Sequence, residues 1–98
     1  MKELQNEKDF EFETKVAEKV VVDFNAIWCG PCKMQHVVLE EVEEKNPGIH
    51  ILLVDVDKFP GIASQFGITS IPTLFFYKNG KLVKQKIGYT EVSELTNF

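Results

Sequence analysis

Residues 20–33 read Val-Val-Val-Asp-Phe-Asn-Ala-Ile-Trp-Cys-Gly-Pro-Cys-Lys, an apolar run followed by two cysteines that are two residues apart. The run Val20–Phe24 is rich in β-branched residues and has the pattern of a strand buried on both faces of a sheet. Pro31 is tolerated in the first turn of a helix, so we expect a helix to open there. Cys29 and Cys32 are the only cysteines of the chain, and such a pair can interconvert between dithiol and disulfide.

The apolar spacing on either side of this stretch predicts alternating helices and strands. The helix that opens at Pro31 is expected to end at Asn46-Pro47-Gly48, with its apolar residues facing inward: Met34, Val37, Val38, Leu39 and Val42. Asn6 and Asp9 resemble a helix start, which predicts a surface helix from Glu7 to about Ala17. Further strands are expected at residues 49–54, 73–77 and 81–87, and a short helix at residues 59–65.

The end of the chain is predicted to form a hairpin and then a helix. Asn79-Gly80 is a two-residue turn signal between β-rich runs, so the strand after it should return antiparallel. Thr90 is expected to start a last helix that runs to the C-terminus, with Val92 and Leu95 inside and Glu91 and Glu94 outside. The pattern as a whole predicts an α/β protein with a mixed sheet.

Length and charge narrow the classes of function. Ninety-eight residues predict a single domain over residues 1–98, and 44% hydrophobic residues suffice for a core without structural disulfides. The net charge of −4 and the scattered lysines argue against a nucleic-acid partner. Residues 1–12 have no apolar stretch of signal-peptide type and no segment has the roughly 18 apolar residues of a membrane span, so we expect a cytoplasmic protein with no membrane partner.

The position of the cysteines predicts their chemistry. Cys29 lies just before the helix that opens at Pro31, where backbone N–H groups and the helix dipole favour a thiolate. Cys32 lies inside the first turn and should be less exposed. We therefore expect Cys29 to attack a substrate disulfide and Cys32 to resolve the resulting mixed disulfide. Asp23, inside the apolar run, either accepts hydrogen bonds at the end of a strand or takes the proton of Cys32, because desolvation raises a carboxyl pKa.

The chain resembles the thioredoxin family in motifs that follow the order of that family: residues 22–24, residues 28–34, Ile71-Pro72-Thr73, residues 76–80 and Gly88. The resemblance covers essentially the whole chain and implies the thioredoxin fold, a central mixed five-stranded sheet flanked by four helices. It implies a protein-disulfide reductase that acts on disulfide-containing client proteins, works as a monomer and is recharged by thioredoxin reductase with NADPH. It implies no bound cofactor beyond the redox-active disulfide Cys29–Cys32, and it favours the proton-accepting role for Asp23.

The resemblance also implies a docking surface for substrate. Pro72 would be a cis-proline that faces the cysteines, leaving the backbone of Ile71 exposed to pair with an extended substrate segment. Gly30 and Pro31, between the cysteines, accompany a strongly reducing couple in this family. The apolar surroundings of Cys29 would be formed by Trp28, Val56, Ile71, Ile87 and Gly88.

Several positions depart from the family pattern or suggest other chemistry. Val37 stands where many members have a kink-forming proline, and Leu53 stands where several carry a lysine near the buried acid, so Asp23 is expected to lack a charge partner. Cys29, Cys32, His36 and His50 could in principle bind zinc. Helical spacing instead places His36 on a polar face with Lys33, Glu40 and Glu43, which predicts a solvated surface histidine and no metal.

Three functions from different classes remain open on the sequence alone. The first is a reductase that uses Cys29 and Cys32 as electron carriers. The second is an oxidase or isomerase on the same fold, which a high reduction potential would indicate. The third is a binding subunit that uses only the docking surface and would keep its partner when both cysteines are serine.

Overall fold

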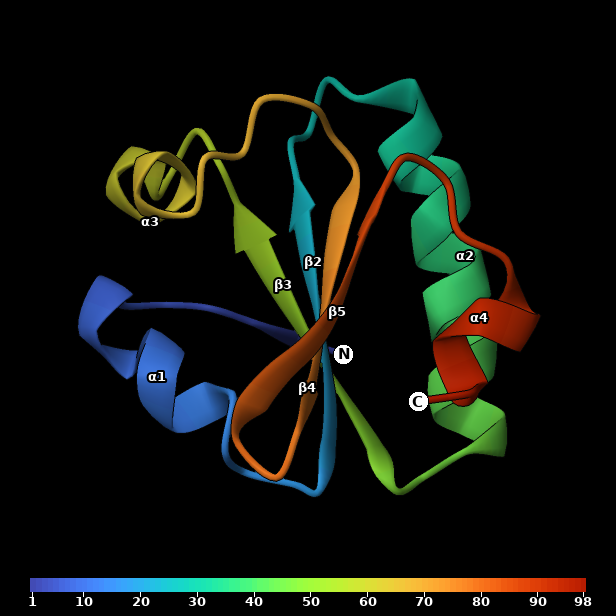
Figure 1. Cartoon of the computed structure of the whole chain (residues 1–98). Coiled ribbons are helices and arrows are strands. Elements are labelled where there is room, and N and C mark those ends of the chain that lie inside the picture. Colours follow the sequence, from blue (N-terminus) through green and yellow to red (C-terminus); the bar gives the residue numbers. More distant parts are fainter.

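A mixed sheet of five strands forms the centre of the computed structural model, which describes residues 1–98 (Figure 1). The strands are β1 (Lys2–Glu3), β2 (Lys19–Asn25), β3 (Ile49–Asp55), β4 (Thr73–Lys78) and β5 (Lys81–Ile87). Their order across the sheet is β1-β3-β2-β4-β5, with β1, β3 and β2 parallel to one another and β4 antiparallel to both of its neighbours. The thioredoxin fold implied by the resemblance is therefore confirmed.

Helices cover both faces of this sheet, as Figure 1 shows. On one side lie α1 (Phe10–Glu13), which follows the 3₁₀ turn η1 (Glu7–Asp9), and α3 (Pro60–Gln65). On the other side lie α2 (Gly30–Lys45) and α4 (Val92–Thr96). The sheet therefore separates two cores.

Residues of β2 alternate between these two cores, as side chains of a strand must. Val20, Val22 and Phe24 pack in the core on the α1 and α3 side. Val21 packs with Leu39 of α2 in the other core. Asp23 follows Val21 by two residues and so points to the α2 side, where the cysteines lie.

The N-terminal segment differs from its prediction. β1, the strand at the edge of the sheet, was not located in the sequence because its two exposed residues carry charged side chains. The helix expected to reach Ala17 ends at Glu13, since Thr14 folds back and donates from Oγ1 to the carbonyl of Glu11. Asn6 precedes the first turn as predicted, but its side chain contacts Asp9 and caps no backbone N–H.

The inward face of α2 was predicted only in part. Leu39 and Val42 are buried and Val38 is half-buried, but Met34 and Val37 are exposed. The buried positions of α2 follow a helical period that also includes a cysteine and one polar residue, Gln35. They are Cys32, Gln35, Leu39 and Val42.

The last two elements form after a tight turn. Asn79 and Gly80 have positive φ values of 53° and 80°, as a two-residue hairpin requires, and β4 pairs antiparallel with β5 as predicted. α4 begins at Val92, two residues later than expected, because the backbone of Thr90 is bonded to the side chain of Gln35. Leu95 is buried as predicted, but Val92 is exposed. None of the helices has the length and apolar character needed to cross a bilayer.

Candidate active site

The two cysteines lie where β2 passes into α2. Cys29 is the N-cap residue of α2, and its Sγ accepts a hydrogen bond from the backbone N–H of Cys32 at 3.2 Å. The two residues form a disulfide, with their Cα atoms 5.2 Å apart. Both are buried in this oxidised form, Cys32 slightly more than Cys29. The sulfur of Cys29 therefore faces a helix N-terminus, where a backbone N–H stabilises negative charge.

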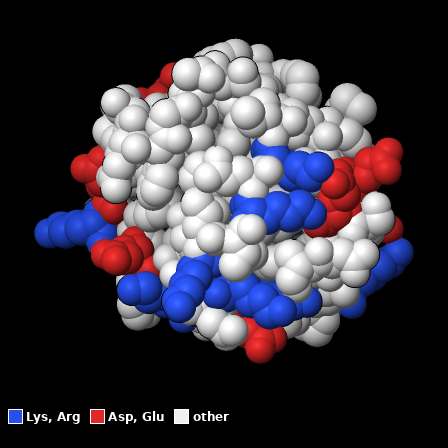
Figure 2. Space-filling model, viewed as in Figure 1, with Lys and Arg blue, Asp and Glu red and all other residues white.

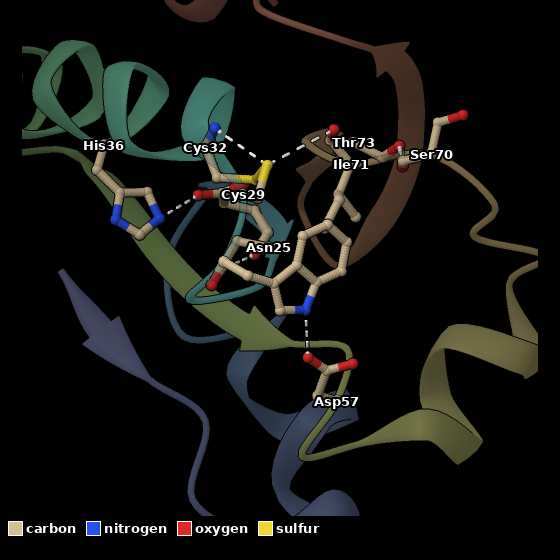
Figure 3. Close-up of a disulfide and its surroundings, with 10 residues drawn as sticks. Asn25, Cys29, Cys32, His36, Asp57, Ser70, Ile71 and Thr73 are labelled. Atoms are coloured by element: carbon tan, nitrogen blue, oxygen red, sulfur yellow. Dashed lines mark hydrogen bonds and ion pairs between the residues drawn. A yellow bond between two sulfur atoms is a disulfide. The ribbon is translucent and has the colours of Figure 1, made fainter.

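The loop before β4 lies against the disulfide, as Figure 3 shows. The Ile71–Pro72 bond is cis, as the resemblance implies, and the carbonyl oxygen of Ile71 lies 3.8 Å from Cys29 Sγ. Ile71 makes no backbone–backbone hydrogen bond, so its peptide groups are available to an incoming chain. Gly88, after β5, donates its N–H to the carbonyl of Pro72 at 2.8 Å, which ties the two loops together. Gly88 has φ = 90°, a conformation that favours glycine.

Apolar side chains surround the disulfide. Val56 and Ile71 are half-buried and pack against the cysteine pair. Trp28 precedes Cys29 in the chain and is 68% exposed, and its Nε1 donates to Asp57 Oδ2 at 2.7 Å, which restrains the indole. Ile87 is also exposed.

The surface at this end of the molecule carries little charge. Gly30 and Pro31 lie between the cysteines and are exposed. On the face shown in Figure 2, the end at which α2 begins is largely white, and lysines gather toward the opposite end. Of the predicted docking residues, Val56 and Ile71 pack against the cysteine pair, and Gly88 is bonded to Pro72 next to Ile71.

Asp23 is fully buried on the α2 side of β2. Neither carboxylate oxygen accepts a hydrogen bond, and its neighbour across to β3 is Leu53, which offers no charge. Burial raises the pKa of Asp23, and His36 opposes the rise. The predicted candidate therefore has an environment suited to holding a proton.

The prediction that His36 is a solvated surface residue, and that Asp23 lacks a charge partner, is wrong. His36 Nε2 lies 2.9 Å from Asp23 Oδ2, and the imidazole is only 29% exposed. The contact is close but does not form a well-aligned hydrogen bond, and it becomes an ion pair when the imidazole is protonated. The contact with Asp23 raises the pKa of His36, partial burial opposes this, and Glu40 and Glu3 add to the rise. The signal in the sequence was the spacing of four from Cys32, which places His36 one helical turn further along the same side of α2.

A second polar contact that the sequence did not reveal holds the segment after β5 against α2. Gln35 is fully buried; its Nε2 donates to the carbonyl of Thr90 at 3.0 Å and its Oε1 accepts from the N–H of Thr90 at 2.7 Å. The bonded pair satisfies both backbone groups of a buried residue. The two hydrogen bonds between Gln35 and Thr90 hold in place the segment that follows Gly88.

The zinc site considered from the sequence has no geometric support. His50 lies 3.5 Å from Glu13, whereas His36 contacts Asp23. No group of three or more His, Cys, Asp or Glu side chains is arranged to hold a metal ion.

Comparisons with known proteins agree with this geometry. The family model described as Thioredoxin matches residues 2–98. A thioredoxin of Chlamydia muridarum is 47% identical over 79 residues, which cover 81% of this chain and 78% of the relative. A thioredoxin of Mycoplasmoides gallisepticum is 39% identical over 95 residues, covering 97% and 95%. The oxidised crystal structure of mitochondrial thioredoxin 3 from Saccharomyces cerevisiae superposes with a TM-score of 0.87 at 34% identity, covering 96% of this chain and 89% of that one.

The fold and the cysteine pair define a protein-disulfide oxidoreductase that carries electrons on a redox-active dithiol. The chain belongs to the thioredoxin family.

Proposed function

We propose that this protein reduces disulfides in client proteins, with Cys29 as the attacking and Cys32 as the resolving residue. The observation that carries the proposal is the hydrogen bond from the backbone N–H of Cys32 to Cys29 Sγ at the start of α2. A sulfur held in this way is stabilised as a thiolate, which is the nucleophilic form. Cys32 lies inside the helix and is reached by Cys29 more readily than by a large substrate.

The reaction proceeds in two exchanges. In the reduced protein, the Cys29 thiolate attacks one sulfur of the client disulfide; a Cys29–client S–S bond forms and the other client sulfur leaves as a thiolate that takes a proton from water. Cys32 then loses its proton and attacks Cys29 Sγ. The Cys29–Cys32 disulfide forms, the Cys29–client bond breaks, and the second client sulfur leaves as a thiolate that takes a proton from water. Two electrons pass from the cysteine pair to the client.

Asp23 takes the proton of Cys32 in the second exchange. Its burial on the α2 side of β2 and its lack of hydrogen bonds support this role. A carboxyl group whose pKa is raised by burial lies closer to the operating pH and exchanges protons more effectively as a base.

The client docks on the apolar surface around Cys29 formed by Trp28, Gly30, Pro31, Val56, Ile71, Pro72 and Gly88. An extended client segment pairs with the backbone of Ile71, which has no backbone partner within the protein. Aromatic and aliphatic contacts on either side of this segment hold the client disulfide next to Cys29.

The cycle is closed by thioredoxin reductase, which returns electrons from NADPH to the Cys29–Cys32 disulfide with no cofactor bound to this chain. Such a cycle belongs in a reducing compartment, and we place it in the cytoplasm with the protein acting as a monomer.

Trapping of clients tests the assignment of the two cysteines. Cys32→Ser should accumulate mixed disulfides between Cys29 and clients, visible on non-reducing gels and lost on adding dithiothreitol. The matched control Cys29→Ser should trap none, because the attacking sulfur is absent. Equal trapping by the two variants, or trapping by Cys29→Ser alone, would contradict the assignment.

The reduction potential tests the direction of electron flow. Equilibration in graded thiol–disulfide buffers should give a value near about −270 mV, which is the reference value for thioredoxin itself and not one worked from this structure. A value closer to about −180 mV or above would instead assign the protein to isomerisation or oxidation.

A further inference from the structure

The imidazole of His36 lies between the buried carboxylate of Asp23 and the outside of the protein. Asp23 is fully buried, and the Nε2 of His36, a side chain 29% exposed, lies 2.9 Å from Asp23 Oδ2. Figure 3 shows the ring reaching inward from α2 toward the disulfide region. The outer side of His36 opens on a pocket of about 350 Å³ that Cys32 and Asn25 also line. A proton that arrives on Asp23 therefore has the imidazole as its neighbour on the way to solvent.

The charged groups around His36 favour its cationic form. Asp23 on β2 contacts it, Glu40 on α2 and Glu3 on β1 act on it at longer range, and Asp55 on β3 lines the same pocket. Lys33 is the one cation among these lining residues. These four carboxylates outnumber the single lysine, which stabilises an imidazolium next to Asp23.

We propose that His36 is a positioning residue that keeps Asp23 ready to accept the proton of Cys32 and passes that proton on to solvent. The inference rests on the proposed role of Asp23 as the base of the second exchange. His36 supplies the charge partner that Leu53, beside Asp23 in the sheet, cannot supply. It differs from a fixed cation because an imidazole can both hold and release a proton near neutral pH.

The proton moves in a balanced sequence. When Cys32 attacks Cys29, the S–H proton passes to Asp23 and the S–H electron pair forms the Cys29–Cys32 bond. The electron pair of the Cys29–client bond leaves with the client sulfur, which takes a proton from water. His36, in the neutral form that carries its proton on Nδ1, takes the proton of Asp23 at Nε2, the atom that faces the carboxylate. The resulting imidazolium gives its Nδ1 proton to water in the pocket, and exchange of the remaining ring proton through water returns it from Nε2 to Nδ1 before the next cycle. Asp23 is then a carboxylate again.

Stopped-flow reaction of the reduced protein with excess 5,5′-dithiobis(2-nitrobenzoate) separates the two exchanges. The first burst of coloured thiolate reports attack by Cys29, and the second reports release through Cys32. His36→Gln keeps a polar side chain but cannot become a cation. It should raise the pH midpoint of the second phase by about one unit, so that release is about tenfold slower below the midpoint, and the rates should converge at high pH. The first phase should keep its wild-type rate.

Two further variants separate this role from a structural one. His36→Lys keeps a cation at the same position and should return the midpoint to the wild-type value or below it. His50→Gln is the matched control, because His50 is also a half-buried histidine beside a buried carboxylate, Glu13, but lies away from the cysteines. It should leave the midpoint unchanged. A uniform slowing of His36→Gln at all pH values, an unmoved midpoint, or an equal shift in His50→Gln would overturn the proposal.

The failure of this inference can be told apart from failure of the proposed function. If Asp23→Asn leaves the second phase unchanged, Asp23 is not the base of the second exchange, and that step of the proposed function is wrong. If Asp23→Asn slows the second phase but His36→Gln leaves its midpoint unmoved, only the role of His36 fails. In the wild-type protein, the ¹³C shift of the Asp23 carboxyl should respond to the ionisation of the His36 ring; independent titrations of the two groups would overturn the proposal even if His36→Gln does not fold.

Discussion

Replacement of Asp23 by asparagine should stabilise the protein, and by an amount that grows with pH. Asparagine has nearly the same shape and can occupy the same fully buried position without a charge. In the wild type, burial raises the pKa of Asp23 above 3.8, its ordinary value. The folded protein therefore binds the Asp23 proton more tightly than the unfolded chain does, and the stability from this group falls as the pH rises from about 4 through the folded pKa.

The ionisation of His36 also makes the free energy of unfolding fall as the pH rises. The pKa of His36 is also raised in the folded protein, so its stabilising contribution is complete below about 6.5 and is lost as the pH rises through its folded pKa. Asp23→Asn removes both dependences. Each unit by which burial raises the pKa of Asp23 adds about 1.4 kcal/mol to the difference at high pH, and about 1 kcal/mol raises the Tm of a chain of this size by about 4–8 °C.

Urea unfolding of wild type and Asp23→Asn at pH values from 3.5 to 8.5 measures this difference. The two curves of unfolding free energy against pH should converge toward pH 3.5, where Asp23 is protonated in the folded protein and mostly protonated in the unfolded chain, and should separate steadily above it. The comparison at pH 3.5 is the internal control for any packing change. Parallel curves, or a variant that is less stable than wild type at pH 8, would refute the argument that the buried carboxylate is a destabilising charge.

Three more variants test the contacts that shape the site. Gln35→Leu leaves both backbone groups of Thr90 buried without partners and should lower the free energy of unfolding by about 2–4 kcal/mol in urea titrations; a loss below about 1 kcal/mol would mean that water replaces the amide. Gly88→Ala meets no atom within 4 Å, so its cost of about 1–2 kcal/mol should come from the positive φ alone, and a neutral result would show that the loop relaxes. Asp57→Ala removes an exposed hydrogen bond to Trp28 and should change stability by less than about 1 kcal/mol, while time-resolved fluorescence anisotropy should show a more mobile indole; an unchanged anisotropy decay would contradict the anchoring role of Asp57.

Predictions from the sequence were most successful for elements whose formation depends on residues close together in the chain. The strand before the cysteines, the start of α2 next to Cys29 and the turn at Asn79-Gly80 follow from apolar runs, a first-turn proline and turn residues. The edge strand β1 was missed because two residues are too few to show an alternation of apolar and polar side chains. Its pairing with β3 also joins residues that lie far apart in the sequence.

The inner face of α2 was less predictable because apolar residues occur on more than one of its sides. Met34 and Val37 are exposed, whereas the polar Gln35 is buried because Thr90 offers it two backbone partners. A pattern of hydrophobicity cannot reveal a buried amide whose partner lies 55 residues away.

The sequence alone determined the chemistry that this protein carries, because two cysteines at the start of a helix, an acid in an apolar strand and an Ile-Pro-Thr segment are each visible in the chain. Only the tertiary structure decided which charged group lies next to the buried acid Asp23. The strand Lys19–Asn25 turns Asp23 toward α2, and the helix turns His36 back to meet it at 2.9 Å. The charge partner of a buried group depends on which faces of two elements meet, and no local pattern in the sequence contains that information.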